Sequence, residues 1–427
     1  MTYIKTPVKG MNDVLPATAK LRRECLDKIR DVYASFGFCE IETPAMENIE
    51  NLSSNDGGEN ESLIFKVLKR GESLKKGIHN LHSPNSRGMD EVVDCGLRYD
   101  LTVPLVRYYS NNATELGATF KSLQIGNVWR ADKPQRGRFR QFTQCDIDIL
   151  GDAGNHSEVE LICATTTALS RVFESTDIKE FTVRVNDRAI LQAAALSAGF
   201  AQGDIGLVLI SLDKYDKIGM DGVRRELESN NFDSSAISKY MSLYEGAEGK
   251  SCDEFCAMIN KEFLDESVVT NLAEIVSLAS DLSSSDAKII YDPTLVRGMG
   301  YYTGPVFEIS IDGLGSSVAG GGRYDAMIKK FTGQDVCAVG FSIGFERIVT
   351  LLSEAGARNN VAEVGATAFL LAPELSAENK RGALAKASAL RQEGSAVGVF
   401  TMKRNMKAQV TSLEALGYTS FEKFYQS

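Results

Sequence analysis

Histidine is scarce in this sequence, with three residues among 427, at positions 79, 82 and 156. His79 and His82 lie in the polar stretch GIHNLHSPNS, where we expect a solvated loop. His156 lies in GDAGNHSEVE, which is typical of a loop that leads into a helix. This distribution argues against a histidine base or a histidine-rich metal site. Catalysis must then use arginines, carboxylates, a metal ion or groups of the substrate.

Cysteine is also too sparse for a disulfide scaffold, with eight residues scattered through a long chain. Cys252 and Cys256 in SCDEFCAMIN are four apart, so on a helix they share a face. Zinc needs two more ligands, and neither a histidine nor a CxxC pair is nearby. We expect two reduced, partly buried thiols and no protein metal site.

Long apolar runs are missing as well, which excludes a predicted membrane span. The N-terminal MTYIKTPVKGMND lacks the apolar core of a secretory signal, so we expect a cytoplasmic protein. The net charge of −10 argues against a broad basic surface for nucleic acid. It leaves room for RNA held by a local basic strip, such as ADKPQRGRFR (131–140). The length predicts two or three domains.

Nucleotide-binding fingerprints of the common kinds are absent: there is no GxGxxG after a strand and no GxxxxGK[ST]. A bound nucleotide therefore needs another architecture. An antiparallel sheet that presents arginines and an aromatic face would serve.

The first part of the chain alternates between helix and strand patterns. We expect a helix over 18–35, a strand within 36–46 that stops at Pro44, and a helix that begins near Thr102. Residues 51–62 and 71–93 are polar and glycine-rich, which predicts loops around a short strand at 62–68. Two strand patterns, 123–132 and 138–151, joined by KPQRG predict an antiparallel hairpin with a basic loop.

The rest of the chain divides into three parts. A helix (158–175) and a strand (180–186) precede a helical, polar stretch at about 188–285, which we interpret as an inserted all-α module. Strand patterns return over 288–325 and lead into a strand-to-helix segment at 339–356. After a linker-like stretch, a β-α-β-α alternation predicts a small α/β domain.

Arginines and acidic residues concentrate at the strand ends. Arginine forks on rigid elements suit phosphate, although each alone is more often a surface ion pair. The arginines are Arg130, Arg138, Arg140, Arg297 and Arg347. Gln144 and Asp148 are an even number apart in a strand, so they face the same side. A solvated sheet face or a polar pocket for a cationic small molecule would both explain them.

Placed in order, these segments resemble the class II aminoacyl-tRNA synthetases. FGFCEIETPAM (36–46) is similar to motif 1, WRAD–loop–RFRQF to motif 2 and VGFSIGFERI (339–348) to motif 3. Six segments, one of them the motif 2 loop, resemble histidyl-tRNA synthetases specifically: KGMNDVLP, LRYDLTVPLVRY, KPQRGRFRQF, LDKYDKIGMDGV, LVRGMGYYTGPVFE and AGGGRYD.

This resemblance implies an α+β fold: a class II antiparallel-sheet catalytic core, a helical insertion and a small α/β C-terminal domain. The core would comprise 1–187 and 286–355, the insertion 188–285, and a shortened domain like the anticodon-binding domain 364–427. It implies a histidine–tRNA ligase that uses ATP and Mg²⁺, binds L-histidine and tRNA(His), and forms a homodimer through motif 1.

The resemblance also implies a role for individual residues. Catalytic roles fall to Arg297 and Arg130. ATP would be held by Arg130, Asp132, Arg138, Phe142 and Arg347. Histidine would be held by Asp100, Thr102, Gln144, Asp148, Arg297, Tyr301, Tyr302 and Tyr324. Gln135 and Arg136 would meet the acceptor end of the tRNA.

Two departures from the family pattern keep alternatives open. Gly300 stands where the family usually has an acidic residue, and the C-terminal domain ends early, at SFEKFYQS, without the family's later strands. The alternatives are a non-ligating regulatory subunit of ATP phosphoribosyltransferase, which shares the fold, and a histidine sensor. The presence of Arg297, Tyr302, Asp148 and Gln144 favours the ligase.

Overall fold

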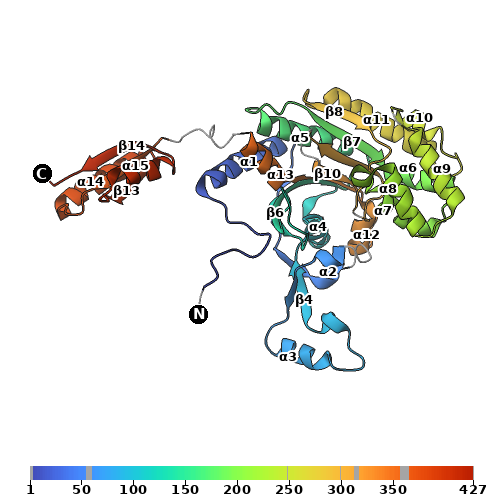
Figure 1. The fold of residues 1–427 in the computed structure, drawn as a ribbon, viewed down its shortest axis with the longest axis horizontal. Helices are drawn as coiled ribbons and strands as arrows, with labels where there is room; N and C mark the ends of the chain where they lie inside the picture. Colours follow the sequence, from blue (N-terminus) through green and yellow to red (C-terminus); the bar gives the residue numbers. More distant parts are fainter. Residues whose placement is uncertain are drawn as a thin grey trace. The chain divides into compact units, whose positions relative to one another are not determined.

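The computed structural model describes residues 3–53, 60–247, 249–298, 300–311, 317–355 and 365–426. The chain forms two compact units, residues 1–13 with 25–355 and residues 14–24 with 356–427 (Figure 1). In the described part of the chain, no helix is both long and apolar enough to cross a membrane.

An eight-stranded sheet is the main element of the larger unit. Its middle strands, from β5 to β7, are antiparallel, and one strand at each edge pairs in parallel. The order is β1 (Cys39–Glu40), β5 (Phe120–Trp129), β6 (Gln141–Leu150), β11 (Ala338–Gly344), β10 (Ser317–Arg323), β9 (Pro305–Ser310), β7 (Phe181–Asp187) and β8 (Ala287–Tyr291). The hairpin predicted over 123–151 is confirmed as β5 and β6. Motif 1 was expected to give a longer strand, which is wrong, because only Cys39 and Glu40 pair with β5.

The register aligns polar and glycine residues in two rows across the sheet. The first row is Arg184, Glu308, Gly320, Ser342, Asp146 and Gln124, one residue from each of six neighbouring strands. The second row, two residues along, is Asn186, Val306, Gly322, Gly340, Asp148 and Ser122. Since side chains two apart on a strand point the same way, both rows lie on one face. We call this face the site floor.

Helices position the flanking residues of the floor. In α5 (His156–Phe173) 13 of the 18 residues are buried, and the helix packs against β11 and β6. In α13 (Phe345–Glu354) the buried positions Phe345, Ile348, Val349 and Leu352 follow the helical period. This packing of α13 against β6 and β10 holds Arg347, on its first turn, over the sheet. The helix predicted near Thr102 is α4 (Thr102–Leu116).

In the described residues between β7 and β8 there are six α-helices, where the sequence predicted an all-α module. They are α6 (Arg188–Ala198), α7 (Ile205–Leu212), α8 (Tyr215–Ser229), α9 (Ser234–Glu245), α10 (Cys252–Cys256) and α11 (Glu266–Leu282). Cys252 and Cys256 share a face of α10 as reduced, buried thiols, with their Sγ atoms 3.9 Å apart. The described residues contain no cluster of three or more metal-ligating side chains.

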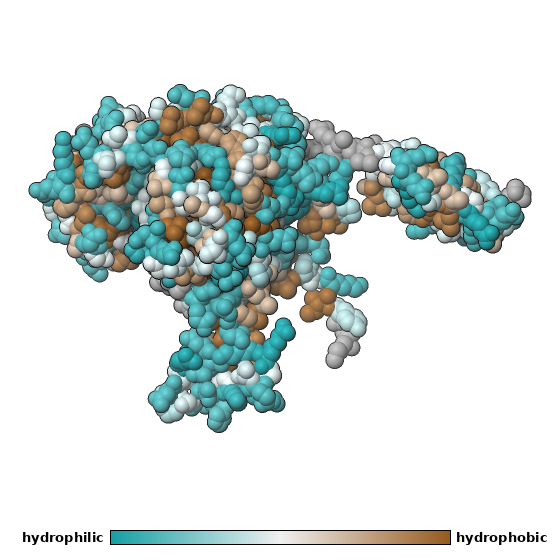
Figure 2. Space-filling view, turned by 180° about the vertical axis from the view of Figure 1, so that it is seen from behind, coloured by the Kyte–Doolittle hydropathy of each residue, from teal (hydrophilic) through white to brown (hydrophobic). Residues whose placement is uncertain are grey.

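A second, three-stranded sheet corrects the prediction for residues 62–93. It is made of β2 (Met46–Asn48), β4 (Val93–Leu97) and β3 (Lys66–Leu68), with α2 (Ile49–Ser53) beside it. The strand predicted over 62–68 is therefore half as long, because its first residues form a 3-10 turn (Asn60–Leu63). The loop predicted after it is wrong: α3 (Gly71–Asn80) carries His79, and a second 3-10 turn spans Gly88–Glu91. The surface of this part is mostly hydrophilic (Figure 2).

The C-terminal unit is a small α/β fold, as predicted, with one more strand than expected. A parallel sheet of order β13 (Val397–Thr401), β12 (Ala366–Leu371) and β14 (Tyr418–Phe424) is joined by α14 (Ala377–Gln392) and α15 (Met406–Glu414). The final segment SFEKFYQS contributes to β14, because Phe421 and Phe424 pack against the cores on the two faces of β12.

Candidate active site

A cavity of about 570 Å³ lies over the site floor. It is lined by all but one of the residues to which the resemblance assigned a site role: Asp100, Thr102, Arg130, Asp132, Gln135, Arg138, Phe142, Gln144, Asp148, Arg297, Tyr301, Tyr302, Tyr324 and Arg347. Arg136 does not line it, and neither does Arg140. Gly300 does not line it either, although Gly298 and Tyr301 do.

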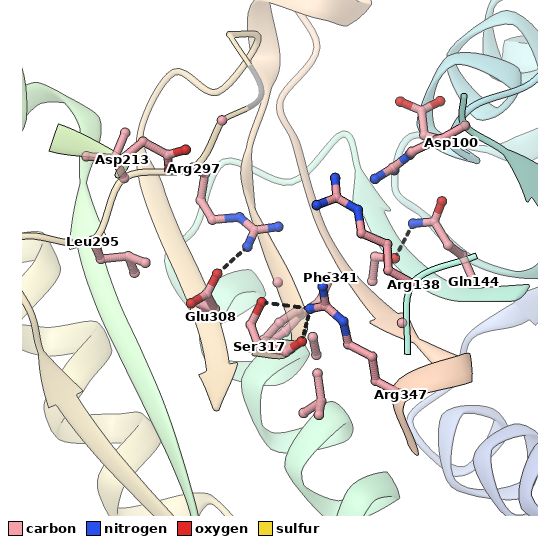
Figure 3. A pocket seen from close by; sticks show the side chains of 18 of the residues that line it. Asp100, Arg138, Gln144, Asp213, Leu295, Arg297, Glu308, Ser317, Phe341 and Arg347 are labelled. Carbon is pink, nitrogen blue, oxygen red and sulfur yellow. Dashed lines mark hydrogen bonds and ion pairs between the residues drawn. The ribbon is translucent and has the colours of Figure 1, made fainter. Parts of the chain in front are cut away.

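Arginines from three separate elements converge at one end of the cavity. Figure 3 shows the guanidinium groups of Arg138, Arg297 and Arg347 pointing toward the same space. Arg347 donates to the backbone oxygen and the hydroxyl of Ser317 rather than to a carboxylate. Burial lowers the pKa of Arg347, and the neighbouring Arg138 lowers it further. Such a concentration of positive charge favours a bound polyanion.

Arg297 lies flat on the floor because the strand beneath it carries glycine. A Cβ at Gly320 would approach the Arg297 guanidinium carbon to 2.4 Å. The Arg297 Nη1 donates to Glu308 at 2.6 Å, and its buried Nε has no hydrogen-bond partner within the described residues. Burial acts to lower the pKa of Arg297, but the Glu308 carboxylate, Tyr302 and Tyr301 together raise that pKa above its usual value. The arginine is thus held charged, with donors left for a ligand.

Arg130 and Phe142 form a stacked pair at the hairpin end. The Arg130 Nε donates to the Tyr99 carbonyl at 2.8 Å, and its guanidinium carbon lies 5.2 Å from the centroid of the Phe142 ring. The half-buried ring of Phe142 also lines the cavity, so it offers a flat apolar surface beside the arginines. Asp132 anchors Arg138 through an ion pair of 2.9 Å.

Buried carboxylates occupy the opposite end of the cavity. Asp148 accepts a hydrogen bond of 2.6 Å from the Tyr324 hydroxyl. Burial raises the pKa of Asp148 to about 7, against the lowering effect of the Tyr324 bond. A Cβ at Gly340 would lie 1.9 Å from the Asp148 Oδ1, so only glycine allows this carboxylate its position. Tyr301 packs against Tyr324 with a centroid distance of 6.0 Å.

Asp146, between Gln144 and Asp148, was missed in the sequence. It accepts a hydrogen bond from Ser342, which in turn accepts one of 2.6 Å from the Gln144 Nε2. The Gln144 Oε1 is left buried, without a partner in the described structure, on a cavity-lining side chain. Burial and the nearby Asp148 raise the pKa of Asp146. The period of two that links Gln144 with Asp148 places Asp146 on the same face, so the signal was present.

The start of α4 supplies a further polar wall. Asp100 accepts a hydrogen bond of 3.1 Å from the Val103 backbone N–H in the first turn of the helix, and Thr102 begins it. Tyr301 is hydrogen-bonded with the Thr102 side chain. The cavity therefore has two ends: one where guanidinium groups gather, two of them paired with Asp132 and Glu308, and one with carboxyl, amide and phenol groups.

The loop of the hairpin carries the two residues assigned to the acceptor end of tRNA. The Gln135 and Arg138 backbones exchange hydrogen bonds of 2.9 and 3.1 Å, with Gly137 between them at a φ of +68°. Arg136 points to solvent and forms a two-point ion pair with Glu354 on α13.

The comparisons with known proteins agree with this architecture. The family model described as histidyl-tRNA synthetase matches residues 10–75 and 90–348. A histidine–tRNA ligase of Leifsonia xyli is 42% identical, over 97% of this chain and 94% of that protein. The chain belongs to the histidyl-tRNA synthetase family. A histidine–tRNA ligase of Aeropyrum pernix is 35% identical, over 82% of this chain and 74% of its own.

Solved structures give the same fold. A histidyl-tRNA synthetase from Nostoc is similar with a TM-score of 0.73 and 26% identity, over 97% of this chain and 90% of that one. A Bacillus halodurans protein described as an ATP phosphoribosyltransferase regulatory subunit/histidyl-tRNA synthetase gives a TM-score of 0.77 at 21% identity, with complete coverage of both. At that identity the second likeness supports the fold alone. The predicted family and fold class are confirmed.

Several cavity residues were given no role from the sequence, and most of them have partners that are distant in the chain. They are Asp146, Arg184, Asp216, Glu308, Ser342 and Glu346. Glu308 carried a weak signal as the end of the quoted segment GPVFE. Arg184 carried none: it is one charged residue in an ordinary strand pattern.

Proposed function

We propose that this chain is a histidine–tRNA ligase, which activates L-histidine with ATP and transfers it to the 3′ end of tRNA(His). The observation that carries the proposal is the division of one cavity into an arginine end and a carboxylate end. A triphosphate suits the first and a cationic amino acid with an imidazole suits the second. The substrate carboxylate then lies where the two ends meet.

In the first half-reaction, a histidine carboxylate oxygen attacks the α-phosphorus, and diphosphate leaves. The reaction requires that the negative charge of the phosphates be neutralised and that the attacking and leaving groups be aligned, and it needs no protein base. This agrees with the scarcity of histidine in the chain. Arg297 and Arg130 are assigned to the α-phosphate, Arg138 and Arg347 to the outer phosphates. Phe142 is assigned to stacking on adenine.

Histidine is assigned to the other end. Asp148, held by Tyr324, would accept from an imidazole N–H, with Tyr302 beside the ring. The Gln144 Oε1, together with Asp100 and Thr102, would accept from the α-ammonium group. The unsatisfied Gln144 oxygen supports this assignment, because a buried acceptor without a donor is costly until a ligand supplies one.

Mg²⁺ fits the arginine end as a phosphate-bound ion. It needs only one or two carboxylates when phosphates supply its other ligands. Glu346 lines that end and would hold it, whereas both oxygens of Glu308 are already bonded to arginines. When bound, the ion neutralises phosphate charge and supports the departure of diphosphate.

In the second half-reaction, a ribose hydroxyl of the tRNA attacks the histidyl carbonyl and AMP leaves. Gln135 and Arg136 are assigned to the acceptor end, and the C-terminal unit (364–427) to the anticodon side, with 1–187 and 286–355 as the catalytic core. We further propose a homodimer through the motif 1 segment, whose β1 is an edge strand, and a cytoplasmic location, where ATP and tRNA meet.

The regulatory-subunit and sensor alternatives require no adenylation. Histidine-dependent exchange of labelled diphosphate into ATP separates them from a ligase, and charging of tRNA(His) then tests the transfer. Exchange that depends on histidine supports the ligase; no exchange at saturating histidine would contradict it.

A further inference from the structure

Arg184, on β7, lies at the centre of an ion-pair network that reaches from the helical insertion to Arg297. Its Nη2 donates to Glu308 at 2.5 Å and to Asp216 at 2.8 Å. Its Nη1 donates to Asp292 at 3.2 Å and to the second oxygen of Asp216 at 3.3 Å. One guanidinium therefore joins carboxylates from three elements, and one of them, Asp216, belongs to the first turn of α8.

Glu308 connects Arg184 to Arg297. One of its oxygens accepts from Arg184 and the other from the Nη1 of Arg297. Arg184, Glu308 and Gly320 are consecutive members of the first floor row, with Arg297 lying over Gly320. The carboxylate cannot turn toward one arginine without changing its bond to the other. Both arginines hold the Glu308 pKa below its usual value, although burial acts in the opposite direction.

The contact with the insertion is the adjustable part of the network. The Asp216 side chain is 58% exposed, whereas those of Glu308 and Asp292 are 13% and 16% exposed. The helical geometry of α8 breaks at Gly219, where φ is 65° and ψ is 176°, so the turn with Asp216 is set apart from the rest of the helix. Asp213, Tyr215, Asp216 and Lys217 all line the cavity. This turn is thus a wall of the site supplied by the insertion.

We propose that Arg184 is a positioning residue that links the first turn of α8 to Arg297: the Asp216–Arg184–Glu308 chain sets the direction of the Arg297 guanidinium. The inference rests on the proposed function, because Arg297 acts on the α-phosphate only in a ligase. The network requires a planar fork with several donors, which arginine has and lysine lacks. Arg184 itself does not touch the reacting atoms.

The test uses Arg184→Lys, Asp216→Asn and the double variant of the full chain. A matched control is Arg224→Lys, whose partner Glu245 lies within the insertion, 3.4 Å away. In Arg184→Lys, kcat for histidine-dependent diphosphate exchange should fall by about tenfold or more, since small misplacements of a catalytic group are costly. The KM for histidine should change by less than about twofold. Asp216→Asn should give a smaller loss, about threefold, and add nothing in the Arg184→Lys background.

Hydrogen–deuterium exchange of residues 212–223 tests the link between Arg184 and the first turn of α8 independently of catalytic activity. Arg184→Lys should speed exchange there, whereas Arg224→Lys should not. A kcat within twofold of the wild type, full additivity of the two substitutions, or unchanged exchange at 212–223 would each overturn the link. Failure of the wild-type chain to exchange diphosphate would instead remove the proposed function, and the hydrogen exchange result would still decide whether Arg184 holds the turn.

Discussion

Replacement of Arg297 by alanine is the most direct test of the divided cavity. The substitution removes the guanidinium from above Gly320, but it leaves Glu308 paired with Arg184. No carboxylate is therefore stranded without a partner, which is the usual reason why loss of a buried arginine unfolds a protein. The Arg297→Ala protein should fold, with the carboxylate end of the cavity intact.

The size of the effect follows from the charge that appears during attack on the α-phosphorus. At an effective dielectric constant of about 20, unit charges about 4 Å apart interact by about 4 kcal/mol. Removal of one preorganised donor from a developing oxyanion typically costs about 10²- to 10³-fold in kcat. We expect a loss in this range in the rate of adenylate formation. Histidine affinity should change by less than about threefold, because Asp148, Tyr324 and Gln144 are untouched.

The assay is single-turnover formation of histidyl-adenylate, with histidine affinity measured separately by calorimetry in the absence of ATP. Arg297→Lys restores the charge without the fork and should recover part of the rate. Arg225→Ala, an exposed arginine of α8 that bonds only to the Asp221 backbone oxygen in the described structure, serves as the control. A tenfold loss of histidine affinity in Arg297→Ala, with adenylation otherwise near normal, would refute the role given to this arginine.

Three other predictions follow from the same geometry. Gly340→Ala places a methyl group against Asp148, so histidine affinity measured by calorimetry should fall at least about tenfold. The control Gly206→Ala on α7, which has open space around it, should leave histidine affinity unchanged. Equal affinities of the two variants would contradict the close fit between Gly340 and Asp148. Burial raises the pKa of Asp148 to about 7 from 3.8, so the folded state binds this proton more tightly than the unfolded chain. The resulting stability is complete below about pH 4 and is lost as the pH rises through about 7, by up to about 4 kcal/mol. When the free energy of unfolding is measured in urea without histidine, Asp148→Asn should lack this part of its pH dependence. Parallel curves of unfolding free energy against pH for the two proteins would contradict the prediction. Arg136→Ala should raise the KM for tRNA several-fold in charging while the rate of diphosphate exchange stays unchanged. The control Glu354→Gln removes the ion pair of Arg136 but keeps the arginine, so it should not raise this KM. Slower diphosphate exchange in Arg136→Ala would show that the loop acts on ATP instead.

Local sequence patterns were sufficient to predict the helices and strands in which apolar residues recur with a clear period. The β5–β6 hairpin and α5 have such periods over ten residues or more, and both formed as expected. The α3 helix was missed because Gly71, Gly77 and Asn80 have low helix propensity. Tertiary packing overrides that preference: Gly77 is buried so close to the Glu91 carbonyl that a Cβ would lie 2.1 Å from it.

The candidate site was predictable where one segment carried several of its residues. Gln144 and Asp148 stood out together with two arginines of the hairpin, Arg130 and Arg138, and all four line the cavity. Glu308, Ser342 and Arg184 take their place only from strand register, which brings together positions more than a hundred residues apart. No local period contains that information, so the ion-pair network became visible only in the folded chain.

The strand order also has a consequence for synthesis on the ribosome. β6 borders β5 on one side, and its other partner, β11, is translated roughly 190 residues later. At about 5–20 residues per second, the nascent chain exposes the β6 edge for roughly 10–40 seconds. That edge has unpaired backbone groups flanked by Ile147, Ile149 and Leu150, which suits unwanted pairing with another chain. The cell must therefore protect a half-built sheet while the helical insertion is made, and slower translation of that insertion should lower the yield of folded protein.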